Sequence, residues 1–507
     1  MPDLSGAPTT LRVLAGSELA DMGGILDEAA KATGVTVKMD LVGSLEGAEI
    51  VATGRADGRY DALWFSSNRY LETLSEANSR LGTATRIMGS PVVLGLRPAT
   101  AQRLGWTGRP VTWKDIAGAA AEGRLTFAMT DPANSNTGFS ALVAVASALD
   151  GSGRALDAAA IDRVAGPLTG FFSAQRLTAG STGWLTEAFV RRMTGADPGG
   201  ALDGLITYEA SLTGLNRDGK LSEQLIVIRP ADGVVSADYP LTLFAGAPTE
   251  ARDAHERLAA YLRQPRVQEQ IAAQTGRRPG VTGAVQPADF PPVPVELPFP
   301  ETREAIDALL TAYQDRLRRP ARTVYVLDVS GSMKGDRIKQ LKAALSGLTG
   351  LNTSLTGSYC RFRSREEVTL LPFSDRPAAP QRFTVEAASP QSSRDRLRTA
   401  VGRLRVGGNT AVYDSLVAAL RELDTAADQN RFASVVLMTD GESNRGRDFA
   451  AFKKYLKGAE PVPVFPVLFG EAAEAPMRQI AALTGGQLWD ARGGDLTKAF
   501  CQIRGYQ

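Results

Sequence analysis

Five oxygen-bearing side chains in the last third of the sequence have the types and spacing of a metal site. Asp328, Ser330 and Ser332 form an Asp-x-Ser-x-Ser pattern, Thr410 follows a Gly-Gly-Asn segment, and Asp440 precedes a glycine. Two carboxylates and three hydroxyls make an all-oxygen set, which suits Mg²⁺ or Mn²⁺ and suits no soft metal. A simpler interpretation is that Asp328 and Ser330 cap a helix and that Asp440 begins a turn.

The elements around these residues favour the metal site. Residues 323–329 and 432–438 are apolar, β-branched runs, which predict strands buried on both faces. Asp328 and Asp440 stand where these two runs end, and Thr410 opens a helix that is predicted to reach Leu423. Because ligand sites of open α/β sheets form at the carboxyl ends of strands, we expect the five side chains to meet at one edge of a sheet.

The whole segment from residue 321 to residue 507 alternates between strand and helix patterns. This alternation predicts a Rossmann-like α/β domain with a mostly parallel sheet and helices on both faces. The patterns predict no element between residues 374 and 409. Further strands are predicted at 368–373, 462–469 and 487–490, and further helices at 337–348, 448–456, 476–483 and 496–504.

The order of the motifs resembles a known metal site. Asp-x-Ser-x-Ser, then Thr, then Asp-Gly is similar to the metal-ion-dependent adhesion site of von Willebrand factor A (VWA) domains, and the resemblance covers essentially all of this segment. It implies that Ser330, Ser332 and Thr410 bind Mg²⁺ or Mn²⁺ directly. It also implies that Asp328 and Asp440 act largely through bridging waters, and that a protein partner supplies a carboxylate to the metal.

A second group of polar residues lies at the ends of elements predicted in the first part of the chain. Three serines follow strands predicted at 11–14, 35–42 and 62–65, an Asn-Thr pair opens a predicted helix, and a tyrosine ends a further strand. Free N–H groups at a helix start favour an anion, and the alternative is simple N-capping by Asn136 or Ser135. The candidate solute-binding residues are Ser17, Ser44, Ser67, Asn136, Thr137 and Tyr208.

Residues 8 to about 283 resemble a type II solute-binding protein, of the kind that binds molybdate, phosphate or similar small solutes. Ser90 to Gly95 is similar to the first hinge strand of such proteins, and Tyr239 to Leu241 is similar to the second hinge. Thr112 to Ile116 resembles the helix that opens the second lobe. The resemblance implies a two-lobed α/β fold with a small solute or oxyanion held between the lobes.

Prolines mark the boundary between the two parts of the chain. Six of them lie between residues 287 and 300 and predict an extended, stiff connection. A helix is predicted from Thr302 to Leu317. The sequence therefore predicts a two-lobed domain at 8–286, a linker with a helix at 287–320 and a VWA domain at 321–507.

The sequence lacks the usual signatures of hydrolases and nucleotide-dependent enzymes. His255 is the only histidine, and it lies in a polar segment that predicts a solvated helix start. No Gly-x-Ser-x-Gly segment and no Gly-x-x-x-x-Gly-Lys-[Ser/Thr] loop is present. We therefore predict a non-enzymatic binding protein. The net charge of +2 gives no reason to expect nucleic acid or an anionic membrane as partner.

The compartment leaves two possibilities open. Residues 1–6 carry no basic region and no apolar core, so the sequence as given shows no signal peptide, which favours the cytoplasm. The family resemblance instead implies an extracellular or cell-envelope protein. No apolar run approaches the ~18 residues that cross a bilayer. The alternative function is that of an intracellular VWA protein that works with an AAA-type ATPase in metal insertion or enzyme assembly.

The sequence contains two cysteines, Cys360 and Cys501. We favour two unrelated buried thiols. The alternative is one disulfide that ties an early part of the VWA domain to its last helix. Two cysteines do not decide the compartment.

Overall fold

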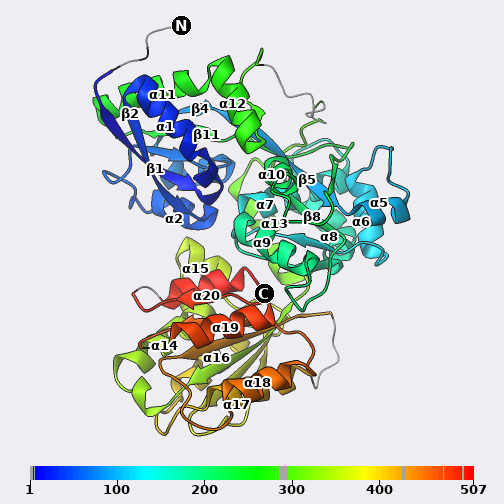
Figure 1. Ribbon diagram of the computed structural model, residues 1–507, viewed down its shortest axis with the longest axis vertical. Coiled ribbons are helices and arrows are strands. Elements are labelled where there is room, and N and C mark those ends of the chain that lie inside the picture. Colours follow the sequence, from blue (N-terminus) through cyan, green and yellow to red (C-terminus); the bar gives the residue numbers. More distant parts are fainter. Residues whose placement is uncertain are drawn as a thin grey trace. The chain divides into compact units, whose positions relative to one another are not determined.

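The computed structural model describes residue 4 and residues 6–284, 292, 295–424, 430–471, 473–493 and 496–507. The chain forms two compact units, which are Met1–Glu187 with Asp203–Ala312 and Ala188–Leu202 with Tyr313–Gln507 (Figure 1). Part of the predicted proline-rich linker, at 287–291 and 293–294, lies outside the described residues, as do residues 285–286. Within the described ranges, no helix has the length and apolar character needed to span a membrane.

The first sheet of the first unit is built around β1, which is buried from Val13 to Gly16. β1 runs parallel to β2 and β3, whereas β11 comes from much later in the chain and lies antiparallel between β3 and β4. The strand order is β2 (Val35–Val42), β1 (Thr9–Gly16), β3 (Ala62–Trp64), β11 (Pro240–Phe244) and β4 (Leu81–Arg86). The helices of this lobe are η1 (Ser17–Met22), α1 (Gly23–Thr33), α2 (Ser44–Ala52), α3 (Arg69–Glu72), α4 (Ser75–Asn78), α11 (Thr249–Leu262) and α12 (Pro265–Thr275).

The second sheet of this unit is centred on β5, all of whose residues are buried. The helix α7 (Asn136–Asp150) is buried along most of its length, which explains why its sequence is apolar on all sides. The strand order is β10 (Ser236–Ala237), β5 (Met88–Leu96), β8 (Gly204–Tyr208), β6 (Phe127–Met129) and β7 (Gln175–Leu177), with β9 (Ile226–Ile228) and β12 (Arg278–Pro279) also paired to β5. The other helices are α5 (Pro98–Leu104), α6 (Trp113–Ala121), α8 (Ala158–Ser173), α10 (Glu209–Arg217) and α13 (Arg303–Ala312), and α9 (Thr182–Met193) passes from the first unit to the second.

Two short crossings join the two sheets, as the predicted two-lobed fold requires. The chain passes from β4 to β5 at Ile87 and returns from β10 to β11 at Asp238 and Tyr239. Tyr239 has a φ of 41°, a left-handed conformation that is unfavourable for a residue other than glycine. The backbone N–H groups of Asp238 and Tyr239 both donate to the carbonyl of Ser66, each at 3.0 Å. These bonds hold the second crossing in its strained conformation.

The second unit contains one six-stranded sheet, and the predicted α/β class is confirmed for it. All neighbouring strands are parallel except β14 and β15. The strand order is β15 (Gln381–Thr384), β14 (Glu367–Phe373), β13 (Ala321–Asp328), β16 (Phe432–Thr439), β17 (Val464–Leu468) and β18 (Trp489–Asp490). The helices are α14 (Asp336–Ser346), α15 (Leu355–Cys360), α16 (Pro390–Gly402), α17 (Val412–Asp424), α18 (Phe449–Leu456), α19 (Glu474–Thr484) and α20 (Leu496–Arg504).

Side chains of the central strand β13 alternate between the two faces of this sheet. Val324 and Val326 pack in a cluster with residues of α17 and α18, which lie beside each other (Figure 1). Tyr325, between them in sequence, contacts the rings of Phe362 and of Phe500 on α20. Because both faces are covered, the strand is apolar throughout, and this is why its sequence predicted a buried strand.

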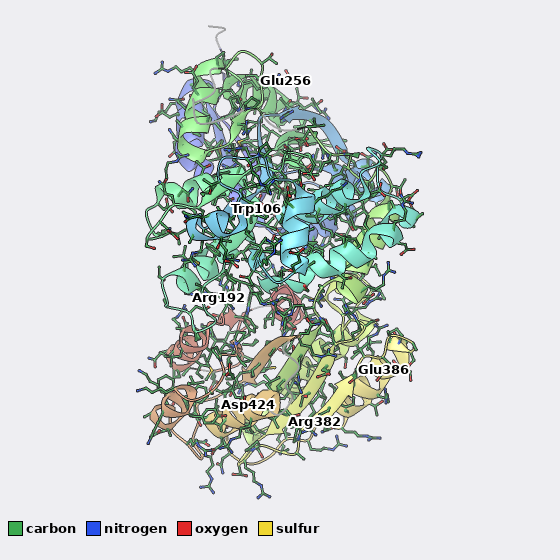
Figure 2. All side chains as sticks on the ribbon, turned by 90° about the vertical axis from the view of Figure 1, so that its right-hand side faces the viewer. Trp106, Arg192, Glu256, Arg382, Glu386 and Asp424 are labelled. Atoms are coloured by element: carbon green, nitrogen blue, oxygen red, sulfur yellow. A yellow bond between two sulfur atoms is a disulfide. The ribbon has the colours of Figure 1, made fainter. Side chains whose placement is uncertain are left out.

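Three elements of the second unit, the strand β15 and the helices α15 and α16, have no counterpart in the sequence prediction. The edge strand β15 has mostly exposed residues, so it carries no apolar alternation. Arg382 on this strand, labelled in Figure 2, donates to Glu422 of α17 at 2.7 Å. Charged residues on an edge strand discourage pairing with a further strand. The helix α16 has a polar composition, so its sequence shows no strong helical period of apolar residues.

The prediction for His255 is wrong. The side chain is only 2% exposed, and its Nε2 atom is 3.1 Å from the carbonyl of Leu241. His255 shares the buried face of α11 with Ala251 and Leu258, at helical spacing. The polar residues on both sides in the sequence belong to the opposite face and suggested exposure. Burial lowers the pKa of this imidazole, which is therefore a neutral residue of the core.

The favoured interpretation of the cysteines is also wrong, and the alternative is confirmed. Cys360 at the end of α15 and Cys501 in α20 form a disulfide. Both elements lie in the second unit. The sequence separation of 141 residues gave no indication of this pairing, because it depends on how two helices meet in three dimensions.

Candidate functional site

The carboxyl end of β13 holds Asp328 in a fixed orientation. Its side chain is fully buried. One carboxylate oxygen accepts the backbone N–H of Ser330 at 2.8 Å, and the other accepts the hydroxyl of Thr439 at 2.7 Å. Thr439 is the last residue of the neighbouring strand β16, so this carboxylate connects two strand ends.

A row of hydroxyl groups extends from Asp328 to the second carboxylate. The oxygens of Ser330 and Ser332 are 2.9 Å apart, and the hydroxyl of Ser332 donates to Asp440 at 2.8 Å. Asp440 directly follows β16, and its side chain is also fully buried. Four of the five predicted residues are therefore linked in one network at the carboxyl edge of the sheet.

The fifth residue, Thr410, lies on the loop that packs against this network. The N–H of Gly331 donates to the carbonyl of Gly408 at 2.9 Å, which holds the loop beside the Asp-x-Ser-x-Ser segment. Gly408 has a φ of 85°, and a Cβ at this position would collide with the carboxylate of Asp375, so glycine is required. The backbone of Thr410 is bonded to Asn444 on both sides, at 2.9 Å in each bond. Among the described residues, Thr410 forms no direct hydrogen bond with the other four.

The electrostatics of this site are those of a place for a cation. Burial raises the pKa of Asp328, and the nearby negative charge of Asp440 raises it further. The sequence analysis missed Arg337, in the first turn of α14, whose guanidinium is 2.7 Å from Asp440. The guanidinium of Arg337 thus pairs with one of the two buried carboxylates, that of Asp440. Arg337 could have been suspected from the sequence, because converging carboxylates need a positively charged partner and this arginine is close to one of them in sequence.

The donor set fits a hard divalent metal. All five side chains offer oxygen, and Asp328, Ser330 and Asp440 are almost fully buried. No cluster of three or more His, Cys, Asp or Glu side chains occurs in the described part of the chain. A metal here would therefore depend on two carboxylates, on hydroxyl groups and on water, which is a composition that Mg²⁺ accepts.

A polar hollow with about 310 Å³ of empty space lies in the first unit, where loops of its two sheets meet. The backbone N–H of Asn136 donates to the hydroxyl of Ser44 at 3.2 Å, and the side-chain amide of Asn136 donates to Ser66 at 3.1 Å. Asn136 begins α7 of the second lobe, whereas both serines belong to the first lobe. The hollow is lined by Gly16, Ser17, Glu18, Val42, Gly43, Ser44, Phe65, Ser66, Asn134, Ser135, Asn136, Gly180, Ser181 and Thr182.

The six predicted solute-binding residues are not all in this hollow. Ser17, Ser44 and Asn136 line it. Ser67 lines a neighbouring apolar hollow of about 420 Å³, which shares part of its wall with the first. Thr137 and Tyr208 are fully buried and line neither hollow.

Thr137 and Tyr208 support the hollow from within the lobes. The hydroxyl of Thr137 is 2.8 Å from that of Thr182, and the hydroxyl of Tyr208 is 3.5 Å from that of Ser140. Thr137 also donates to the carboxylate of Glu18. Burial raises the pKa of Tyr208, so its phenol stays protonated.

The sequence analysis missed the charged residue of the polar hollow, Glu18. Hydroxyls of Ser66 and Thr137 donate to its carboxylate. Burial raises the pKa of Glu18, and the positive charge of Arg277 acts against this rise. Glu18 stands next to Ser17 at the end of β1, so its position could have identified it. Hydroxyl and amide groups are the usual signals of an anion site, and a carboxylate is not one of them.

Arg277 contacts three groups of the first unit. Its guanidinium lies 2.8 and 2.7 Å from the two carboxylate oxygens of Asp21 and donates to the backbone carbonyl of Glu18 at 2.7 Å. It also lies over the ring of Tyr239, 4.9 Å from the ring centre. This arginine therefore joins η1 to the second crossing between the lobes.

Two family models match the chain. The model for bacterial extracellular solute-binding proteins matches residues 11–278, and the model for the von Willebrand factor type A domain matches residues 324–489. A curated relative, inter-alpha-trypsin inhibitor heavy chain H4 of Sus scrofa, is 26% identical over 132 residues. That alignment covers 25% of this chain and 13% of the relative, so the chain spans a small part of its length.

Solved structures match either part of the chain. The periplasmic binding protein AfuA from Actinobacillus pleuropneumoniae is 12% identical, with a TM-score of 0.48, and the match covers 61% of this chain and 98% of that one. A von Willebrand factor type A protein from Catenulispora acidiphila is 20% identical, with a TM-score of 0.30, over 38% of this chain and 43% of that one.

The solute-binding match extends over more than half of the chain and includes both sheets of the first unit. The VWA match includes the strands β13, β14, β16 and β17 of the second unit. The chain belongs to the bacterial extracellular solute-binding proteins and carries a von Willebrand factor type A domain in its C-terminal part.

Proposed function

We propose that this chain is a non-enzymatic binding protein with two sites. The VWA domain holds Mg²⁺ through Asp328, Ser330, Ser332, Thr410 and Asp440 and presents the ion to a carboxylate of a protein partner. The first domain binds a small solute between its lobes. The observation that carries the metal proposal is the network that joins the two buried carboxylates through the hydroxyls of two serines.

The residues of the metal site have distinct roles in this proposal. Asp328 orients the loop, because it accepts the N–H of Ser330 and the hydroxyl of Thr439. Ser330 and Ser332 present hydroxyl oxygens, and the Gly-rich loop holds Thr410 beside them. A bound Mg²⁺ supplies a positive charge with a coordination position that a partner carboxylate can take. The two buried carboxylates exceed the charge of Arg337, so a further cation stabilises the site.

Direct hydrogen bonds between the lobes support the solute-binding role. Asn136 of the second lobe donates hydrogen bonds to Ser44 and Ser66 of the first. These bonds join the two lobes directly, without a further group between them. A solute that satisfies the same polar atoms would bind the closed form in preference to an open one. Both domain families consist typically of binding domains, which agrees with a protein that has no catalytic role.

A cell-envelope or extracellular location agrees best with these features. The solute-binding family is an extracellular one by its description. The disulfide between Cys360 and Cys501 is of a kind that persists in oxidising compartments. The alternative, an intracellular partner of an AAA-type ATPase, predicts reduced cysteines and co-purification with a cytosolic ATPase. Fractionation of cells that express the native gene, with a thiol-labelling assay, distinguishes the two.

Calorimetric titration with Mg²⁺ and Mn²⁺ tests the metal site. Asp328→Asn keeps the shape of the side chain and removes its charge, and we expect it to abolish binding that the wild type shows. Glu442→Gln is the matched control, because it removes an exposed carboxylate two residues after Asp440. Metal binding by the control should equal that of the wild type. Equal heats for the wild type and Asp328→Asn, or no binding by the wild type, would contradict the proposal.

A further inference from the structure

The wall of the polar hollow contains one carboxyl group and no basic side chain among its described residues. Its side chains are serine and threonine hydroxyls, two asparagine amides, Val42, Phe65 and the carboxyl group of Glu18. No lysine, arginine or histidine is among the described residues that line it. Hydroxyl groups bind ligands of any charge, so the charge of Glu18 decides what the hollow prefers.

The charges behind this wall do not reverse that preference. Arg277 binds both carboxylate oxygens of Asp21 and contacts Glu18 through the backbone carbonyl. One guanidinium therefore faces the carboxyl groups of both Asp21 and Glu18, so it supplies no excess of positive charge to the hollow. An anion in the hollow would be repelled by the carboxylate of Glu18. A cation would form a direct ion pair with this carboxylate, which would compensate for the water that it loses on burial.

The N–H groups before helix α7, which the sequence suggested as an anion site, already have acceptors. The carboxylate of Asp131 accepts the N–H of Ala133 at 2.7 Å and the side-chain amide of Asn134 at 3.1 Å. The N–H of Ser135 donates to the carbonyl of Asp131, and that of Asn136 donates to Ser44. The protein itself thus supplies the anion and the acceptors at this turn.

From this geometry we propose that the polar hollow binds a small organic cation, whose ammonium group pairs with Glu18 and donates to the surrounding hydroxyls. The proposal deepens the proposed solute-binding function and rests on it. Phe65 lines both hollows, and aromatic rings attract ammonium groups. The apolar hollow next to it gives room for the carbon chain of the solute.

A metal ion is a poorer occupant of the polar hollow than an organic cation. Hard metal ions need several charged or strongly polar oxygens around them, and Glu18 is the one carboxylate among the described lining residues. Tyr208 does not add a phenolate, because burial raises its pKa. Hydroxyls that accept hydrogen bonds from N–H groups match an ammonium group better.

Solutes of matched size and different charge test the proposal on the full chain. The cations are ethanolamine, putrescine and glucosamine. Their neutral counterparts are ethylene glycol, 1,4-butanediol and glucose, and their anionic counterparts are glycolate, succinate and glucuronate. Sulfate, phosphate and molybdate complete the series. Calorimetry and thermal shift should show the cation binding at least about tenfold more tightly than the other members of its size class.

Variants of Glu18 test whether its carboxylate determines the preference for a cation. Glu18→Gln keeps the size of the side chain, and it should weaken binding of the cation about tenfold or more and remove the preference over the neutral counterpart. Glu18→Asp keeps the charge and should retain the preference at lower affinity. Glu28→Gln removes an exposed carboxylate from the same lobe and should change nothing. The melting temperature of each variant without solute shows whether it is folded.

The outcomes separate the two levels of the proposal. A neutral or anionic solute that binds the wild type as tightly as its cationic counterpart would overturn the cation preference and leave solute binding intact. The same conclusion follows if Glu18→Gln binds the cation as the wild type does. If no solute binds the wild type, the solute-binding function itself fails, and the cation preference fails with it.

Discussion

Replacing Arg337 by methionine should increase the affinity of the VWA domain for Mg²⁺. The guanidinium of Arg337 lies 2.7 Å from Asp440, and a second nitrogen lies 3.6 Å from Glu471. In the protein without metal, this group is the counter-ion of a fully buried carboxylate. A divalent ion that uses Asp440 must share it with the arginine or displace the arginine. Methionine has a similar length and no charge, so it leaves the carboxylate to the metal.

The size of the effect follows from the exposure of the pair. Two unit charges ~4 Å apart attract each other by about 4 kcal/mol at an effective dielectric constant of 20. The side chain of Arg337 is 31% exposed, so solvent screening reduces the net contribution to about 1 kcal/mol. The dissociation constant for Mg²⁺ should therefore fall about fivefold in Arg337→Met. Without metal, Asp440 lacks its partner, and the melting temperature of the domain should fall by about 2–4 °C.

The two expected changes have opposite signs, which makes the test specific. Calorimetric titration gives the dissociation constant, and thermal unfolding with and without Mg²⁺ gives the stability. Lys339→Met is the control, because Lys339 lies on the same helix and pairs only with the exposed carboxylate of Asp336 among described residues. An unchanged or weaker affinity for Mg²⁺ in Arg337→Met would refute the reasoning, since Arg337 would then position the site and would not compete with the metal.

Two further predictions follow from burial and from the disulfide. Binding of a cationic solute to the polar hollow should weaken as the pH falls, because burial raises the pKa of Glu18 and a protonated carboxyl cannot pair with an ammonium group. Arg277 stays charged and Tyr208 and Tyr239 stay neutral, since the pKa values of all three are raised, and Glu18→Gln should show no such dependence in calorimetry at several pH values. Changing Cys360 and Cys501 together to serine should lower the free energy of unfolding of the VWA domain by about 2–4 kcal/mol in a denaturant titration, and a reductant should then have no further effect.

The metal candidates were predictable because their signal is local in the sequence. Asp328, Ser330 and Ser332 follow an apolar run that is buried on both faces, and such a run can hardly be anything except a central strand. Asp440 follows a second run of the same kind. Once two parallel strands are assigned, the meeting of their carboxyl ends follows from sheet geometry. The two-lobed fold was expected from the resemblance to type II solute-binding proteins, in which two segments are similar to hinges.

Other features depend on contacts between distant segments and have no local signal. The strand β15 is polar and pairs along one edge only, so its sequence shows no alternation. Cys360 and Cys501 meet because α15 and α20 pack together. His255 is buried by the sheet that lies under its helix, and the strand that contacts it is β11. In each of these cases, the sequence pattern of one segment does not reveal the distant segment that it contacts.

Charged partners were missed for a different reason. Glu18 and Arg337 each lie within a few residues of a predicted site, but charged side chains are usually solvated at the surface. Their importance appears only when the structure shows which groups they face. For Glu18 these are the hydroxyls of Ser66 and Thr137, and for Arg337 the carboxylate of Asp440.

Ser66 is a single residue that contacts both the polar hollow and the second crossing between the lobes. Its hydroxyl contacts Asn136 and Glu18, whereas its carbonyl holds the N–H groups of Asp238 and Tyr239. A solute that moves this serine therefore acts directly on the residue whose carbonyl restrains the strained backbone. Ser66 thus links the wall of the hollow to the second crossing over one amino acid, without any relay through the core of either lobe.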